Sequence, residues 1–115
     1  MKVNLKRDFV DCFGEQLKQK VVDPKSKDGI KEEVLTVWKV VASKLYNLST
    51  LNGVGLKPEV KYNAYQLCNR IIATPEAVEL SVEEASFIKE VAGEQLSAGA
   101  YGLVVDLIEK GENNV

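Results

Sequence analysis

Helix start and stop signals divide the second half of the chain into segments whose apolar residues recur at helical spacing. Pro58 suits the first turn of a helix, and Pro75 is placed to end it. Ser81 and Glu84 have the residue types and the separation of a capping box, which marks the start of a second helix. Ser97 can cap a third, and the apolar residues of each segment fall on one stripe. The predicted helices span residues 58–73, 81–93 and 97–110.

A further helix is predicted in the first half of the chain. Apolar residues recur at helical spacing from Ile30 to Leu45, and Glu32 and Glu33 lie where negative charge favours the start of a helix. The stripe is rich in valine, which is a poor helix former, so this helix depends on burying it. We predict a helix over residues 30–48.

The first 22 residues have a different pattern. Met1 to Leu5 alternates polar and apolar residues, and Gly14 supplies the backbone freedom that a tight turn needs. We predict a β-hairpin over residues 1–22, with strands at 2–9 and 16–22. The apolar residues between 8 and 20 also fit a helical period, which leaves a short helix there as the alternative.

Together these elements predict a mainly α (α+β) fold, a single compact four-helix domain of 115 residues with an N-terminal β-hairpin. The composition, 45% hydrophobic and 28% charged, is typical of a globular protein that can form a core. The opening residues lack the apolar run of a signal peptide, and no stretch approaches the ~18 apolar residues of a membrane span. We therefore expect a cytoplasmic protein that does not contact membranes.

The chain contains no histidine, which removes the commonest general base and a preferred zinc ligand. Cys12 and Cys68 cannot complete a tetrahedral zinc site by themselves, and both are expected to be buried as small apolar side chains. Gly53 and Gly55 lack the lysine and the preceding strand of a phosphate-binding loop. We predict a non-enzymatic protein with no catalytic residues, no cofactor and no metal site.

The charges are unevenly distributed. Residues 1–75 carry 13 Lys and Arg against 8 Asp and Glu, a net charge of +5, whereas residues 76–115 carry 2 against 9, a net charge of −7. Such an asymmetry suits docking to a partner or head-to-tail self-association, although solvated helix faces produce it as well.

Three segments of the chain resemble a family of small bacteriophage and prophage proteins. They are Lys-Tyr-Asn-Ala-Tyr-Gln-Leu-Cys-Asn-Arg-Ile-Ile (61–72), Val-Glu-Leu-Ser-Val-Glu-Glu-Ala-Ser-Phe-Ile-Lys (78–89) and Tyr-Gly-Leu-Val-Val-Asp-Leu-Ile-Glu (101–109). The opening Met-Lys-Val-Asn-Leu and the turn Asp-Cys-Phe-Gly are similar to the short hairpin with which such proteins begin. The resemblance implies a phage origin, a helical fold and the cytoplasm of a bacterial host. It implies no catalytic residues.

The first functional hypothesis is a phage accessory or assembly protein that binds another protein, viral or host, and is a candidate homo-oligomer. Aromatic residues are the anchors of many protein interfaces, although tyrosines also fill cores with their hydroxyls at the surface. The candidate interface residues are Trp38, Tyr46, Tyr62, Tyr65 and Tyr101.

The alternative is nucleic-acid binding by the basic N-terminal segment, where lysine and arginine can neutralise phosphates. The candidate phosphate contacts are Lys2, Lys6, Arg7, Lys18 and Lys20. Against this alternative, the chain contains only two arginines, the usual readers of base edges.

Overall fold

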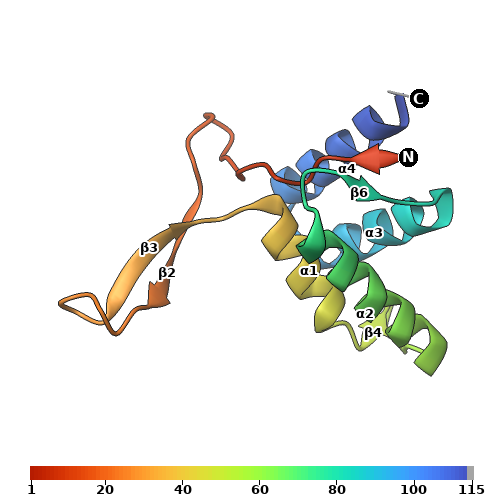
Figure 1. Ribbon diagram of the computed structural model, residues 1–115, viewed down its shortest axis with the longest axis horizontal. Helices are drawn as coiled ribbons and strands as arrows, with labels where there is room; N and C mark the ends of the chain where they lie inside the picture. The colour runs from red at the N-terminus through yellow and green to blue at the C-terminus, as the bar shows by residue number, and fades with distance from the viewer. Residues whose placement is uncertain (114–115) are drawn as a thin grey trace.

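The computed structural model describes residues 1–113 and shows an α+β fold dominated by helices (Figure 1). Within these residues, four helices accompany three short antiparallel strand pairs. The elements in chain order are β1 (Lys2–Val3), β2 (Lys18–Val22), β3 (Ile30–Val34), α1 (Val37–Tyr46), β4 (Thr50–Leu51), β5 (Val54–Gly55), α2 (Pro58–Ala73), β6 (Val78–Glu79), α3 (Val82–Gln95) and α4 (Ala98–Asn113). The predicted class, four helices with a hairpin near the N-terminus, is confirmed, although different residues form the hairpin.

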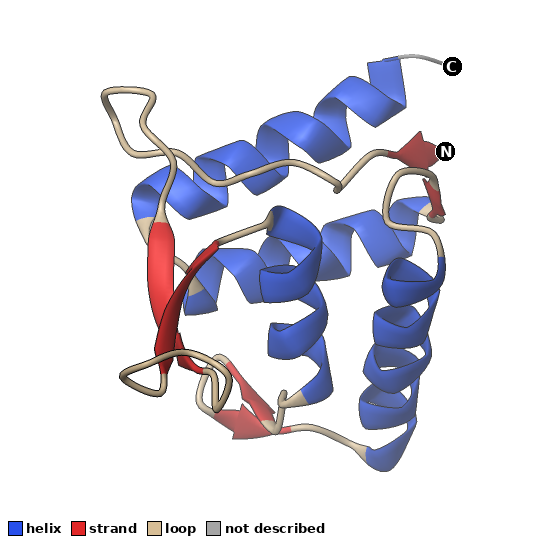
Figure 2. Cartoon of the chain, turned by 60° about the vertical axis from the view of Figure 1, so that its left-hand side comes forward, coloured by secondary structure: helices blue, strands red, loops and turns tan. Residues whose placement is uncertain are grey.

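The core lies among the four helices and the first nine residues of the chain. α1 packs against α2 and α3, and α4 packs against α3 and β1, as the turned view in Figure 2 shows. Ile71, Val104 and Ile108 are fully buried, and burial of a side chain of this size contributes about 1.5–3 kcal/mol. No polar or charged side chain of residues 1–111 is buried with them. No helix within residues 1–113 is long and apolar enough to cross a membrane.

The predicted pairing of residues 2–9 with 16–22 forms only next to its turn, where Leu17 N–H donates to the Phe9 carbonyl and Val10 bridges Gln16; for residues 2–5 it is wrong. β1 pairs instead with β6, about 75 residues away along the chain, in the register Lys2↔Glu79 and Val3↔Val78. Leu5 extends the contact by donating its N–H to the carbonyl of Pro75 at 2.8 Å. The alternation of polar and apolar residues around Val3 and Leu5 correctly predicts an extended chain. The two buried side chains, however, belong to the helical core and not to a local hairpin.

The hairpin that does form joins β2 to β3, so the predicted helix over 30–48 is also wrong in its first part. Residues 30–34 are a strand, in the register Lys18↔Val34 to Val22↔Ile30, and the helix begins only at Val37. The valine and isoleucine side chains that made this stripe poor in helix propensity suit a strand once a partner strand is present. Residues 23–29 form the loop of this hairpin, and residues 8–20 contain no helix.

We refer to residues 18–34 as the arm, because they project away from the helices (Figure 1). The radius of gyration is 15.0 Å, larger than the ~13 Å expected for a compact chain of this length. A closed set of backbone hydrogen bonds holds the root of the arm. Phe9 N–H donates to the carbonyl of Leu35, Leu35 N–H to that of Leu17, and Leu17 N–H to that of Phe9. The buried Phe9 side chain thus anchors the arm to the core.

The starts of the C-terminal helices follow their local signals, whereas two of their ends do not. The capping box at Ser81 is confirmed, with the Ser81 hydroxyl accepting from Glu84 N–H at 3.1 Å and the Glu84 carboxylate accepting from Ser81 N–H at 2.9 Å. Ser97 accepts from Ala100 N–H at 3.4 Å. By contrast, α3 continues past its predicted end at 93 to Gln95, and α4 continues past its predicted end at 110 to Asn113.

Cys12 is exposed, whereas Cys68 is buried as predicted. The reason is the turn that contains Cys12. The Asp11 carboxylate accepts hydrogen bonds from the N–H groups of Phe13 and Glu15, and Gly14 adopts a φ of 83°. This self-contained turn holds its side chains away from the core.

Candidate protein-binding surface on α1 and α2

Three exposed tyrosines lie together where the end of α1 meets the first half of α2. Tyr46 is the last residue of α1, and Tyr62 and Tyr65 lie one turn apart on α2. The ring centroids of Tyr46 and Tyr65 are 6.5 Å apart, and those of Tyr62 and Tyr65 are 6.1 Å apart. Their exposed fractions are 65%, 58% and 47% for Tyr46, Tyr62 and Tyr65. We call these three residues the tyrosine cluster.

The exposure of these rings follows from the way α2 packs. The helix buries a stripe formed by Ala64, Leu67, Cys68 and Ile71, which leaves Tyr62, Tyr65 and Ile72 on a second stripe that faces solvent. Ile72 is 53% exposed, although Ile71 beside it is fully buried. Two adjacent residues of a helix point about 100° apart, and of this pair only Ile71 faces the core.

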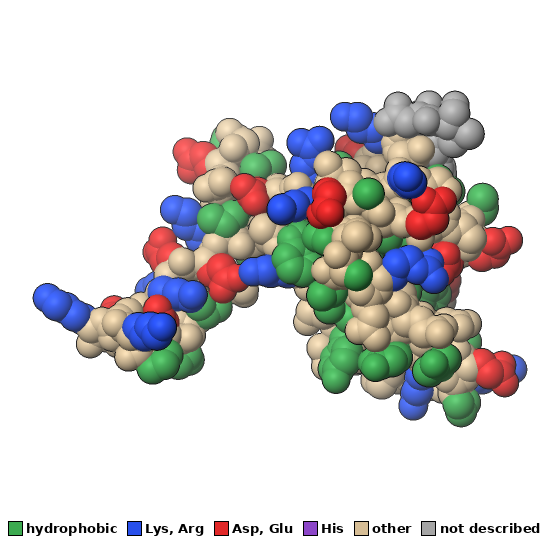
Figure 3. Space-filling model, in the orientation of Figure 1, with side chains coloured by type: hydrophobic (Ala, Val, Ile, Leu, Met, Phe, Trp, Pro, Cys, Tyr) green, Lys and Arg blue, Asp and Glu red, His purple; other side chains and the backbone are tan. Residues whose placement is uncertain are grey.

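A shallow apolar groove continues from Tyr46 along the contact between α1 and α2. Its volume is about 250 Å³. The half-buried Trp38 and the exposed Ile72 line its sides, while the small side chains of Ala42 and Cys68 lie between them. Burial raises the pKa of the Cys68 thiol above its ordinary value. Figure 3 shows hydrophobic side chains gathered over the end of α1 and the first half of α2. We call Trp38, Tyr46, Tyr62, Tyr65 and Ile72 the α1–α2 surface.

The groove is bordered by a charged pair that links α1 to the arm. Lys39 Nζ lies 2.9 Å from a carboxylate oxygen of Glu33 and 5.6 Å from the ring centroid of Trp38. The hydrogen bond from Lys39 lowers the pKa of the Glu33 carboxyl below its ordinary value. The Lys39–Glu33 ion pair therefore connects the arm to the edge of the groove.

Four of the five aromatic residues predicted for an interface thus lie on one surface, and the fifth does not. Tyr101 lies on α4, where its ring packs on Gly93 of α3; a Cβ at residue 93 would be 3.3 Å from that ring. Ile72 was missed as a surface residue, although its position next to the buried Ile71 was a signal for it.

The predicted phosphate contacts do not form one patch. Lys2 lies on β1 beside α4, whereas Lys18 and Lys20 lie on β2 in the arm, at the other end of the molecule (Figure 1). Lys20 is directly opposite Glu32 in the β2–β3 register, which reduces its local positive charge. Lys6 and Arg7 are exposed on the segment between β1 and the root of the arm.

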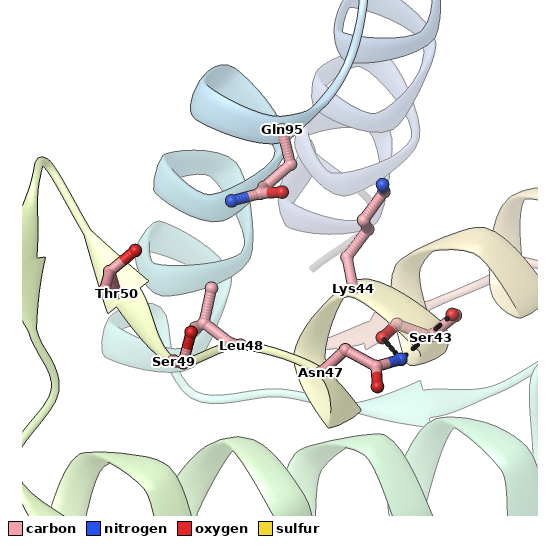
Figure 4. Close-up of a pocket in the computed structure, with 7 residues that line it drawn as sticks. All are labelled: Ser43, Lys44, Asn47, Leu48, Ser49, Thr50 and Gln95. Atoms are coloured by element: carbon pink, nitrogen blue, oxygen red, sulfur yellow. Dashed lines mark hydrogen bonds between the residues drawn. The ribbon is translucent and has the colours of Figure 1, made fainter.

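Two further hollows are lined mainly by polar side chains. Figure 4 shows the first, a pocket of about 240 Å³ where Lys44 from α1 and Gln95 from α3 lie near the β4 strand. Its other polar side chains are hydroxyls and amides, and Asn47 Nδ2 donates to the Ser43 carbonyl at 2.9 Å. Lys44 is the only titratable side chain among its lining residues, so the pocket offers no acid–base pair.

The second hollow, about 470 Å³, lies between α2 and α3. Arg70 Nη1 lies 2.7 Å from the Glu84 carboxylate and also donates to the carbonyl of Glu79 at 3.1 Å. Desolvation raises the pKa of Glu84, but the hydrogen bonds from Ser81 and Arg70 outweigh it and leave that pKa below its ordinary value. These charges hold the start of α3 against α2.

The paired carboxylates of α3 also have a structural role. Glu94 accepts from Asn52 N–H at 2.8 Å, and Glu90 accepts from the Asn52 side chain at 2.9 Å, which holds the turn between β4 and β5. In the part of the chain that the structure describes, no group of three or more Cys, Asp or Glu side chains is arranged to hold a metal ion.

No family model, curated protein or solved structure matches this chain.

Proposed function

We propose that this protein acts without catalysis, by binding another protein through the α1–α2 surface. The observation that carries the proposal is the tyrosine cluster, in which the centroid of the Tyr65 ring lies 6.5 Å from that of Tyr46 and 6.1 Å from that of Tyr62, and all three residues are about half exposed. A tyrosine that only completes a core exposes its hydroxyl and buries its ring. These rings expose far more than a hydroxyl.

The composition of the surface suits a protein partner. Tyrosine and tryptophan dominate the energetics of protein interfaces, where truncation of a central anchor costs about 2 kcal/mol or more. Trp38 and Tyr46 border a groove that an apolar side chain of a partner can enter, and Tyr62 and Tyr65 extend the contact along α2. The adjacent Lys39 and Glu33 provide a polar rim.

We further propose that the protein belongs to a bacteriophage or prophage and works in the cytoplasm of the bacterial host. The support for this step is the resemblance of residues 61–72, 78–89 and 101–109 to small phage proteins. The partner is then a viral structural or assembly protein, or a host protein that the phage redirects. The proposed activity needs no cofactor and no metal.

The experiment is an affinity capture from host cells during phage growth, with identification of captured proteins by mass spectrometry, repeated with a Tyr46→Ser/Tyr65→Ser variant. Because both side chains are exposed, the variant should keep its free energy of unfolding within about 1 kcal/mol of the parent. We expect it to lose the partner that the parent captures. A Tyr46→Phe/Tyr65→Phe variant, which keeps the rings, should retain that partner.

Tyr101→Ser is the matched control, because it removes a tyrosine from a different face of the molecule. Loss of the partner by this control and not by the cluster variant would overturn the proposal. Capture that disappears after nuclease treatment would instead favour the nucleic-acid alternative, with Lys18 and Lys20 as its first residues to test.

A further inference from the structure

The arm has two open edges and an uncovered apolar pair. Among the described strands, β2 and β3 pair only with each other, and Figure 1 shows them projecting away from the helices, to which the Lys39–Glu33 ion pair connects them. Val22 and Ile30 are directly opposite each other near the end of the arm, with exposed fractions of 86% and 46%. A two-stranded ribbon with open edges is marginally stable alone and is a template for further strand pairing.

The alternation of hydrogen-bonded and non-hydrogen-bonded pairs along the hairpin shows which backbone groups face each open edge. Leu35 donates to Leu17 and Asp23 donates to Gly29, and hydrogen-bonded pairs alternate along an antiparallel ladder. Lys31 and Glu33 therefore turn their backbone groups toward β2. The residues of β3 that turn theirs outward are Ile30, Glu32 and Val34.

The side chains of β3 are self-complementary about its central residue, Glu32. If a second copy of β3 lies antiparallel with Glu32 opposite Glu32, then Ile30 faces Val34 of the second copy and Lys31 faces Glu33 of the second copy. Each unlike pair occurs twice because of the two-fold symmetry. The two central Glu32 carboxylates repel each other, but each has Lys20 opposite it on its own β2.

The outward direction of the Glu32 backbone groups also fits the register that places Glu32 opposite Glu32. Two outward-facing Glu32 residues can exchange N–H and carbonyl bonds with each other, as the hydrogen-bonded pair of an antiparallel ladder does. The turn already uses both backbone groups of Ile30, because its N–H donates to the Asp28 carboxylate at 3.3 Å and its carbonyl accepts from the Ser26 hydroxyl at 2.9 Å. The carbonyl has a second lone pair for Val34 N–H of the second copy, whereas the N–H has to exchange Asp28 for the Val34 carbonyl.

The edge of β2 lacks these properties. An antiparallel pairing of two β2 strands about Lys20 would place Lys20 opposite Lys20, Lys18 opposite Val22 and Gln19 opposite Val21, so no pair of opposite charges forms between the two copies. Charge and side-chain type thus single out the edge of β3.

We propose that two copies of this protein form a dimer by pairing their β3 strands antiparallel about a two-fold axis at Glu32. The product is a four-stranded sheet in the order β2–β3–β3–β2, in which Val22, Ile30 and Val34 of the second copy form one continuous apolar row. Because the contact is isologous, it closes at two copies and does not extend into a filament. The dimer uses none of the five residues of the α1–α2 surface and shares with it only Glu33 of the polar rim.

The first test is sedimentation equilibrium of the full chain over a wide range of concentrations, with proline placed on each edge in turn. The N–H groups of Glu32 and Lys20 both point outward, so proline at either position removes an edge donor and keeps the β2–β3 ladder. We expect the parent to have twice the monomer mass at high concentration, Glu32→Pro to be monomeric, and Lys20→Pro to remain a dimer.

The second test exchanges the charges that the register brings together. Lys31→Glu and Glu33→Lys each replace two attractive pairs by two repulsive ones, which should weaken self-association by roughly tenfold or more. When the two variants are mixed, glutamate at 31 of the first variant faces lysine at 33 of the second. Glu33 of the first variant faces Lys31 of the second, so both pairs are attractive. We therefore expect the mixture to form a dimer where each variant alone does not.

Three outcomes would overturn the dimer. They are a parent that stays monomeric at every concentration, a dimer that survives Glu32→Pro, and a mixture of charge variants that does not associate. A dimer that is lost in Tyr46→Ser/Tyr65→Ser but kept in Glu32→Pro would move the contact to the α1–α2 surface. That pattern would contradict this proposal and leave the protein-binding role of the surface intact.

Discussion

Gly111 of α4 lies directly against the backbone of Lys2. A Cβ at residue 111 would be 2.7 Å from the Lys2 carbonyl oxygen and 2.9 Å from Cγ2 of Val3. The absence of a side chain at this position therefore lets the last turns of α4 pack on β1, while β6 pairs with β1 along its edge. The contact joins the two ends of the described chain in one core.

Gly111→Ala should lower the free energy of unfolding by about 1–3 kcal/mol, because the new methyl group has to displace backbone rather than a flexible side chain. Urea unfolding followed by circular dichroism measures the change. Gly102→Ala is the matched control on the same helix, where a Cβ has nothing within 4 Å. It should stabilise the protein by up to about 1 kcal/mol through helix propensity. Equal effects at the two positions would contradict the packing of α4 on β1.

Glu84 should make the stability of the start of α3 depend on pH. Its folded pKa lies below the ordinary value of 4.5, so its contribution is present above 4.5 and is lost as the pH falls through the folded pKa. Glu84→Gln should therefore unfold more easily at neutral pH, by up to about 1 kcal/mol for a partly exposed ion pair. Urea unfolding across the acid range should show the two proteins converging. A difference that persists at the acid end would mean that the Arg70 pair is not its cause.

The two thiols should differ in reactivity. Cys12 is exposed in its turn, whereas Cys68 is 2% exposed and burial raises the pKa of its thiol, which lowers the fraction of reactive thiolate. A thiol-disulfide reagent should label one cysteine per folded chain rapidly, and the second only in denaturant. Cys12→Ser should remove the rapid phase, and Cys68→Ser should leave it. Rapid labelling of Cys68 in the native protein would show that the floor of the α1–α2 groove opens to solvent.

Binding to duplex DNA should be weak and should disappear at physiological salt. Lys18 and Lys20 lie on the arm and Lys2 lies on β1 at the other end of the molecule, so few phosphates can be neutralised at once. Fluorescence anisotropy with a labelled duplex at increasing salt measures the affinity and its salt dependence. Tight binding at physiological salt that Lys18→Ser/Lys20→Ser abolishes would support the nucleic-acid alternative over the protein-binding function.

The local signals of the chain predicted the helical part of the fold well. The helix expected over 58–73 and α2 comprise the same residues, and the capping box of Ser81 and Glu84 forms as its spacing indicated. Such signals act within one or two helical turns, so the sequence contains all the information that they need. The exposed tyrosine cluster was predictable in part for the same reason, since Tyr62 and Tyr65 lie one turn apart on a single helix.

The largest errors concern which segments pair as strands. The residues from Ile30 to Val34 have a stripe that fits a helix, and only the presence of β2 beside them makes them a strand. Polar and apolar residues alternate around Val3, as is typical of a strand, but this alternation does not predict that β6 is the partner strand. Tyr46 reaches the tyrosines of α2 only because α1 packs on that helix.

By itself, the sequence determined the type and the ends of most helices, the lack of histidine chemistry and the set of aromatic residues from which a surface could form. Tertiary structure decided which of these residues meet, where the hairpin lies, and that the arm leaves the edge of β3 open. The physical reason is that helix propensity and capping depend on neighbours along the chain. Strand pairing and side-chain exposure instead depend on which distant segments occupy the adjacent space.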